Sequence, residues 1–223
     1  MQQFTLPFCS ATSYHIDEFI ISSSNHHAYN IIRQWPSHFG VLPYPFCILL
    51  YGPKSSGKTH LARIWQQVSN ALILQHHTTL SATIIKSYDA FIIEDVEFNW
   101  LPQDILHCIN LLNENKKYLL ITTANLFNNF DLDDLTSRMN SIFKLIIEQP
   151  DDKLMQILIF KYFSNYQISL SNQALDFLLV HLPRKFDGIL YLLAKINAFA
   201  LEHHRNMTVP LIKEVIITNK NIL

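Results

Sequence analysis

The sequence predicts an α/β fold, with a parallel sheet flanked by helices, followed by a small all-α domain. The first observation is that short apolar runs alternate with helix-like stretches through the first two-thirds of the 223 residues. Such alternation is typical of a parallel sheet covered on both faces. The second observation is a change at residues 149–152, after which the apolar stretches have helical spacing.

Five apolar runs are the candidate strands, because strands that are buried on both faces read as continuous apolar segments. They lie at 46–51, 71–74, 90–93, 118–121 and 141–147. Helices are predicted at 59–68, 103–113, 153–163, 171–182, 185–203 and from 209 onward. We therefore expect three parts: an amino-terminal peptide, an α/β domain and a helical domain. Their predicted limits are 1–12, 13–150 and 151–223.

Composition and charge exclude several classes of protein. Hydrophobic residues make up 49% and charged residues 16%, as in a folded globular chain. A net charge of −1 gives no global electrostatic reason to bind DNA directly. The first residues lack the features of a secretory signal, and no apolar run has the length of a membrane span. The three scattered cysteines fit a reducing compartment, so we expect a cytoplasmic protein without membrane contact.

Residues 52–59 carry a phosphate-binding signature between a predicted strand and a predicted helix, which is the context that a P-loop requires. Glycine backbone amides can turn toward phosphate oxygens, a lysine ammonium can contact the β- and γ-phosphates, and a threonine hydroxyl can ligate Mg²⁺. We expect ADP or ATP to bind along this loop and the residue after it. The segment reads Gly52-Pro53-Lys54-Ser55-Ser56-Gly57-Lys58-Thr59-His60.

Two acids follow the predicted strand at 90–93. Glu94 would hold Mg²⁺ through a water, together with Thr59, and Asp95 would orient the attacking water. The alternative is a pair of solvated carboxylates. The next strand ends in hydroxyls, and Thr123 either senses the γ-phosphate or caps a turn.

The order of these motifs resembles the DnaA-related AAA+ family. The P-loop ends Gly-Lys-Thr-His-Leu-Ala, and the acidic strand end matches the Walker B stretch of the family. Three further segments, at 120–125, 135–138 and 183–190, are similar to its sensor 1, its Ser-Arg box and its sensor 2 helix. The resemblance implies an AAA+ domain with a helical lid. Because the chain ends soon after the last predicted lid helix, we expect the shorter Hda type instead of the initiator itself.

The resemblance gives two arginines separate roles. Arg184, on the lid, would fold over the nucleotide bound in the same chain. Arg138 would project toward ATP held by a neighbouring AAA+ subunit, as an arginine finger. On spacing alone, Arg138 would be a surface ion pair and Arg184 a charge at a helix start.

The first residues are similar to the sliding-clamp-binding peptide of Hda-type proteins. Pro7 favours an extended segment, and Leu6 and Phe8 are apolar anchors for a preformed pocket. Gln3 and Phe4 complete the match. The alternative is a strand that docks on the protein's own core.

The implied function is regulation of replication initiation, in which the clamp-bound protein stimulates hydrolysis of ATP on a DnaA-type initiator through Arg138. The implied partners are therefore the initiator and the DNA polymerase sliding clamp, with a homo-oligomer left open. The acids Glu94 and Asp95 and the sensor 1 threonines depart from the family pattern, which weakens the expectation of intrinsic ATP hydrolysis. A self-contained ATPase such as a helicase loader, and a non-catalytic ADP-bound adaptor, stay as alternatives.

Overall fold

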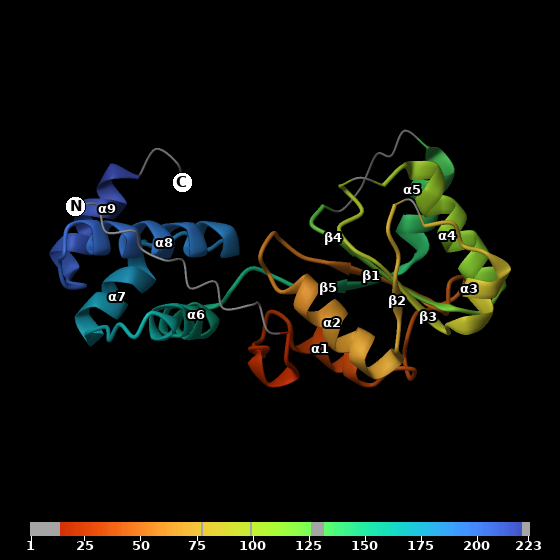
Figure 1. Ribbon diagram of the computed structural model, residues 1–223, viewed down its shortest axis with the longest axis horizontal. Helices are drawn as coiled ribbons and strands as arrows, with labels where there is room; N and C mark the ends of the chain where they lie inside the picture. The colour runs from red at the N-terminus through yellow and green to blue at the C-terminus, as the bar shows by residue number, and fades with distance from the viewer. Residues whose placement is uncertain (1–13, 77, 99, 126–131, 220–223) are drawn as a thin grey trace.

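The computed structural model describes residues 14–76, 78–98, 100–125 and 132–219. Its first part is built on a parallel sheet, and its second part is helical (Figure 1). The strands are β1 (Cys47–Tyr51), β2 (Leu72–Ile73), β3 (Ala90–Ile93), β4 (Tyr118–Thr123) and β5 (Phe143–Ile146). Their order across the sheet is β2-β3-β4-β1-β5, and all these pairings are parallel. The predicted α/β fold with a parallel sheet is confirmed.

Both faces of the sheet are buried, which explains the continuous apolar runs. In β1, Cys47 and Leu49 belong to one core cluster, whereas Ile48 and Leu50 belong to another. Successive side chains of a strand point to opposite faces. A strand inside a two-sided core therefore needs apolar residues at every position, and β1 has them.

Helices cover each face of this sheet (Figure 1). The helices α1 (His26–Arg33) and α2 (Lys58–Ser69) contribute to the core cluster that contains Ile48. On the other face, α4 (Pro102–Glu114) and α5 (Asp133–Ser141) contribute to the cluster that contains Leu49, and the short α3 (Ala82–Ser87) packs against it.

The second part has its own core. Its helices are α6 (Asp152–Asn165), α7 (Asn172–His181), α8 (Phe186–Glu202) and α9 (Val209–Thr218). Two of them begin at side-chain caps: the Asp151 carboxylate accepts from the Leu154 amide at 2.7 Å, and the Ser171 hydroxyl from the Ala174 amide at 3.2 Å. These caps fix where α6 and α7 start. None of the described helices has the length and apolar content to cross a membrane.

The helical part meets the α/β part at the segment before α1. This segment contains a short 3-10 turn, η1 (Ile16–Glu18). The Lys161 ammonium on α6 donates to the Glu18 carbonyl at 3.0 Å, and the Ser23 hydroxyl donates to the Asp151 carboxylate. These two contacts hold the amino-terminal half of the helical part beside the chain that leads into α1.

Three helices were not predicted, namely α1, α3 and α5. Each of α1 and α5 buries only two residues, Ala28 and Ile32 in one and Leu135 and Met139 in the other. Two apolar positions do not make a recognisable helical repeat in a sequence. The strand expected from residue 141 begins at Phe143, because α5 continues through Ser141.

Candidate nucleotide-binding site

The phosphate-binding loop lies where β1 ends and α2 begins. A Cβ atom added to Gly52 would come within 2.8 Å of the Ser56 hydroxyl oxygen and 2.9 Å of the Ile147 Cβ, so the backbone there leaves room only for glycine. Gly57, immediately before α2, has a φ of +95°, which favours glycine. The first amides of a helix have no partner within the helix and are available to an anion. The loop therefore fits a phosphate group.

Lys58 lies over this loop instead of extending into solvent. Its ammonium donates to the carbonyls of Gly52 and Pro53 at 2.8 and 3.0 Å, and the residue is 6% exposed. Burial lowers the pKa of Lys58, while the nearby carboxylates of Asp95 and Glu97 act to raise it. The charge thus stands between the loop and the acidic turn, within reach of any phosphate bound to the loop.

A cavity of about 210 Å³ opens beside the loop. Its walls come from the P-loop and α2, from the segment around η1, and from the lid-like helices α6 and α8. The ring of Phe19 stacks on Tyr29 and meets His60 edge-on, with ring centroids 5.6 and 5.3 Å apart. The lining residues are Glu18, Phe19, Ile20, Asn25, Ser55, Ser56, Gly57, His60, Leu154, Leu158, Lys161 and Phe186.

This cavity fits part of a nucleotide. Its apolar and aromatic walls carry a few polar groups, as ligand pockets usually do. The Ser56 hydroxyl is buried and has no hydrogen-bond partner among the residues described. A buried polar group without a partner in a native fold is rare and calls for a ligand or water. The loop and the cavity together therefore suit a base or sugar in the cavity with its phosphates on the loop.

The acidic turn follows β3 at the same edge of the sheet. The Asp95 amide donates to the Thr122 hydroxyl at 2.8 Å, and the Ala124 amide donates to the Glu97 carboxylate at 2.8 Å. Burial raises the pKa of Asp95, and the neighbouring charge of Glu97 adds to this rise. These contacts tie the turn to the end of β4, so Asp95 and Glu97 both face the Lys58 side of the site.

Glu94 has a different partner. Its carboxylate accepts from the guanidinium of Arg63 on α2 at 2.9 Å, and its second oxygen is buried without a hydrogen-bond partner among the described residues. Burial raises the pKa of Glu94 and the charge of Arg63 lowers it. The donor set expected for Mg²⁺, Thr59 with Glu94, therefore does not fit the ion, since its one carboxylate is already engaged by a cation.

Thr123 caps a turn in this structure. Its hydroxyl donates to the Asn125 carbonyl at 2.9 Å and accepts from the Asn125 amide at 3.1 Å. Its own carbonyl accepts from the Gly52 amide at 3.2 Å. Of the two roles that the sequence left open for Thr123, these contacts favour the cap.

Arg138 lies near the amino-terminal ends of the strands, whereas the P-loop lies at their carboxyl-terminal ends. Its guanidinium donates to the Tyr44 hydroxyl at 2.6 Å and to the Asp134 carboxylate at 3.4 Å. Tyr44 lies just before β1 in the chain, and the P-loop begins just after β1. The five residues of β1 extend roughly 16 Å at about 3.3 Å per residue. Arg138 is thus separated by the length of a strand from the nucleotide site of its own chain.

Arg184 lies between α7 and α8 and forms an ion pair with Asp152, at the start of α6, at 2.6 Å. Both side chains are mostly exposed, and Arg184 is not among the residues that line the 210 Å³ cavity. Lys161 is instead the lid cation that lines it. The peptide residues Gln3, Phe4, Leu6, Pro7 and Phe8 lie outside the described residues.

Comparisons with known proteins find similarity to Hda and to DnaA proteins. The family model described as the lid domain of Hda matches residues 151–216. The chain is 24% identical, over 90% of its length and 51% of the relative, to the chromosomal replication initiator protein DnaA of Aliarcobacter butzleri. It is 25% identical to an uncharacterized protein of Haemophilus influenzae, over 78% of this chain and 83% of that one. The chain thus spans about half the length of the DnaA relatives that it matches.

Solved structures share the fold. Domain III of the Thermotoga maritima replication initiation protein DnaA superposes with a TM-score of 0.67 at 18% identity, over 93% of this chain and 96% of that one. AMPPCP-bound DnaA from Aquifex aeolicus superposes with a TM-score of 0.60 at 21% identity, over 81% of this chain and 64% of that one.

These matches support a DnaA-related AAA+ protein of the Hda type. The predicted family is therefore confirmed, as is the prediction of a helical lid after the α/β domain. In this Hda-type protein, the P-loop, the acidic turn and the end of β4 come together at one edge of the sheet, as their order in the sequence predicts.

The sequence reasoning missed several residues of the Hda-type site. Arg63 had no motif to mark it, and Glu97 lies in the Walker B-like stretch but had no role of its own. Leu154, Leu158 and Lys161 of the lid had a usable signal, since their spacing of four and three residues places them on one face of a helix. That face lines the same cavity as the P-loop.

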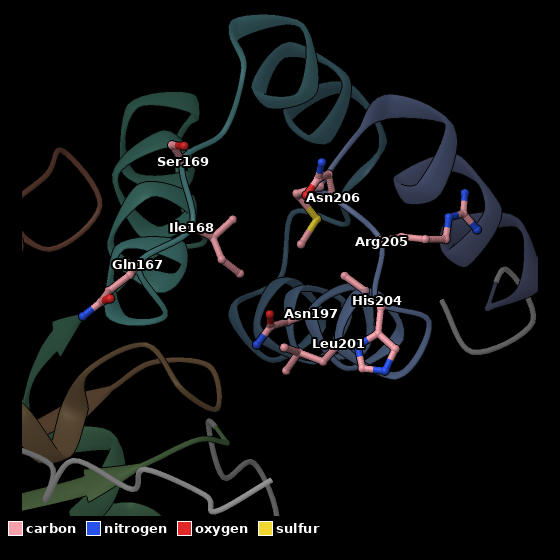
Figure 2. A pocket seen from close by; sticks show the side chains of 10 residues that line it. Gln167, Ile168, Ser169, Asn197, Leu201, His204, Arg205 and Asn206 are labelled. Atoms are coloured by element: carbon pink, nitrogen blue, oxygen red, sulfur yellow. The ribbon is translucent and has the colours of Figure 1, made fainter. Parts of the chain in front are cut away.

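A separate cavity of about 470 Å³ lies within the Hda-type lid, away from the P-loop. Figure 2 shows its lining, which comes from the α6–α7 connection, the end of α8 and the α8–α9 connection. Asn197 lies on its wall and is 4% exposed. None of the predicted site residues lines this cavity.

Proposed function

We propose that this protein regulates replication initiation by stimulating hydrolysis of ATP bound to a DnaA-type initiator. Arg138 would supply the arginine finger. ADP or ATP would occupy the P-loop site of the protein itself, and the sliding clamp would be held by the peptide at residues 3–8. Under this proposal the domains are the clamp peptide at 1–12, the AAA+ domain at 13–150 and the lid at 151–223.

The position of Arg138 carries the proposal. It lies beyond the amino end of β1, whereas the P-loop lies beyond the carboxyl end. A guanidinium at that edge is out of reach of its own nucleotide, so any phosphate that it contacts belongs to another subunit. Its side chain is 30% exposed, so part of it is accessible to such a partner.

The chemistry of arginine suits this role. A guanidinium is planar and always charged, and it presents a fixed fork of donors to phosphate oxygens. Charge develops on the transferred phosphoryl group during hydrolysis, and a positioned arginine stabilises it. In GTPases an arginine finger is worth roughly three to five decades of rate. A regulator needs only this one group to act on a partner that already holds ATP.

The nucleotide bound to the P-loop of this protein would stabilise its folded structure. The 210 Å³ cavity is shared by the P-loop, the segment around η1 and the lid, so a bound nucleotide would contact all three. The similarity to an AMPPCP-bound DnaA supports an adenine nucleotide here. Ligand that binds only the folded state stabilises it, and here it would also fix the lid against the AAA+ domain.

The experiment is a reconstitution with purified components. An initiator loaded with labelled ATP is mixed with DNA-loaded sliding clamp and with this protein, and hydrolysis of the bound ATP is followed over one turnover. The proposal predicts acceleration that requires all components. A protein that carries Leu6→Ala and Phe8→Ala should lose the acceleration at low concentration and recover it at high concentration, because only tethering is removed.

The outcome also separates the alternatives. Acceleration that survives Arg138→Ala would favour an adaptor that brings other proteins to the clamp. Hydrolysis of ATP by the protein alone, at a rate independent of the initiator, would favour a self-contained ATPase.

A further inference from the structure

A cation from within the chain occupies the carboxylate that P-loop proteins usually offer to a metal ion. The guanidinium of Arg63 lies 2.9 Å from the Glu94 carboxylate, and both side chains are mostly buried, 31% and 17% exposed. Arg63 follows Thr59 by four residues on α2, so the two share one face of the helix. The threonine that would ligate a metal and the arginine that replaces its charge are therefore neighbours.

Arg63 is held in this place by other contacts. Its second terminal nitrogen donates to the Gln66 side chain at 3.3 Å, and its guanidinium carbon lies 6.0 Å from the centre of the Tyr14 ring. Planar stacking and forked donors are the properties that make arginine suited to buried ion pairs. The remaining oxygen of Glu94 is buried and has no hydrogen-bond partner among the described residues, and a metal ion that reached it would stand beside the positive charge of Arg63, which opposes its binding.

We propose that Arg63 replaces the divalent cation at this P-loop, so that the site binds adenine nucleotide without a metal ion. The proposal rests on the nucleotide binding put forward above, and it specifies that the bound nucleotide is free of metal. Mg²⁺ gives up its waters reluctantly and is held in such sites by one or two carboxylates together with phosphate oxygens. With Glu94 paired, the Arg63–Glu94 pair is neutral and gives the metal no charge to bind.

The remaining acids do not restore a metal site. Asp95 and Glu97 lie near the ammonium of Lys58. Glu97 already accepts a hydrogen bond from the Ala124 amide. The ammonium of Lys58 already offsets part of the negative charge of these two acids, so they attract a metal ion less strongly. Lys58 is therefore the cation left for the phosphates, and Arg63 supplies the charge balance behind it.

The test is nucleotide affinity with and without metal, measured on the whole chain by calorimetry. ADP is titrated into protein in Mg²⁺ and into protein in EDTA. The proposal predicts dissociation constants that differ by less than about threefold. A larger loss of affinity in EDTA would overturn it.

Variants locate the cause. In Arg63→Gln the Glu94 carboxylate is free, so Mg²⁺ should now improve ADP affinity by about threefold or more. With Mn²⁺ as a paramagnetic probe, the variant with ADP should bind the ion and the wild-type chain should not. In the double variant Arg63→Gln with Glu94→Gln, Mg²⁺ should no longer improve ADP affinity and Mn²⁺ should no longer bind. Arg205→Gln is the matched control, since Arg205 pairs with Glu214 at 2.8 Å in the lid, and it should behave as wild type.

Failure of this inference is distinguishable from failure of the proposed function. Absence of ADP binding in either buffer would contradict both. Tight binding that requires Mg²⁺ would contradict only the role of Arg63 and would leave the regulatory function intact. If Arg63→Gln does not fold, which circular dichroism would show, the comparison of wild-type affinities still decides.

Discussion

The guanidinium of Arg138 and the hydroxyl of Tyr44 are joined by a hydrogen bond of 2.6 Å that spans 94 residues of sequence. Tyr44 is 7% exposed and belongs to a core cluster, so a rigid group holds a charged one at the surface. A free arginine side chain loses about 2 kcal/mol of conformational freedom when it is fixed. The bond to Tyr44 removes part of this cost before any partner arrives, which makes Tyr44 a positioning residue for Arg138.

Tyr44→Phe should weaken the stimulation of initiator ATP hydrolysis by about three- to tenfold. The substitution keeps the ring in the core and removes only the hydroxyl, and a loss of three- to tenfold corresponds to about 1 kcal/mol, the usual net value of one hydrogen bond. The measurement is the single-turnover assay described above. Binding of the variant to the initiator should be unchanged within about twofold.

Tyr118→Phe is the control for this prediction. Its ring packs with Trp35 and Phe39 against the other face of the sheet. Loss of its hydroxyl should leave the stimulation unchanged. Equal effects of the two substitutions would mean that Tyr44 acts through the general stability of the core, and its role as a positioning residue would be wrong.

Gly52→Ala should abolish tight nucleotide binding. The added Cβ would meet the Ser56 hydroxyl oxygen at 2.8 Å and the Ile147 Cβ at 2.9 Å, so the loop must shift. We expect ADP affinity to fall by about tenfold or more, measured by calorimetry. Gly40→Ala brings a Cβ to 2.6 Å from the Pro45 carbonyl at the amino edge of the sheet, and it should lower stability without this specific loss of affinity. A Gly52→Ala protein that binds ADP normally would show that the phosphates lie elsewhere.

Lys161→Ala should lower ADP affinity by about three- to tenfold. The Lys161 side chain lines the cavity and ties α6 to the Glu18 carbonyl at 3.0 Å. Its removal takes away both a positive charge near the ligand and the contact that holds the lid to the turn. Lys153→Ala, on the same helix but outside the cavity lining, is the control and should have no effect on affinity. Equal ADP affinities of the wild type, Lys161→Ala and Lys153→Ala would show that Lys161 of the lid does not contribute to nucleotide binding.

Asp151→Ala should destabilise the protein at neutral pH by about 1 kcal/mol, the usual value of a helix cap. For a chain of this size the melting temperature should fall by about 2–4 °C. Hydrogen bonds from the Ser23 hydroxyl and the Leu154 amide hold the pKa of Asp151 below its ordinary value. Since the folded-state pKa is the lower one, the carboxylate stabilises the fold above about pH 4 and stops doing so as the pH falls through the folded-state pKa.

The pH dependence distinguishes this cap from a neutral one. The difference between wild type and Asp151→Ala should shrink as the pH is lowered below about 4. Ser171→Ala removes the cap of α7 and should cost a similar amount at every pH, because a serine hydroxyl does not titrate in this range. Parallel pH profiles of the two variants would contradict the assignment of the charge to Asp151.

The strands and the phosphate loop were predictable because their signals are local. Ile48 and Leu50 mark a buried strand by their immediate neighbours, and the spacing of Gly52 and Gly57 before Lys58 defines the loop. Such patterns need no knowledge of what lies across the sheet, and the structure has both features in the expected places.

The contacts that decide the chemistry were not predictable in this way. Arg63 and Glu94 are 31 residues apart, and Tyr44 and Arg138 are 94 apart. Their pairing depends on the register of the sheet and on the rotation of α2 and α5 about their axes. Neither feature can be read from a single short stretch of sequence. The family pattern assigned Glu94 to a metal ion. The structure shows that its carboxylate instead forms an ion pair with Arg63.

The most direct test of the proposed function compares Arg138→Ala with the wild-type protein on ATP already bound to the initiator. Both proteins are used at concentrations that saturate the clamp-bound complex, so that binding is equal and only the chemical step differs. The account predicts that the wild type accelerates this single turnover and that Arg138→Ala does not, although it still binds nucleotide and clamp. Equal acceleration by the two proteins would contradict the role of Arg138 and leave an adaptor as the better description.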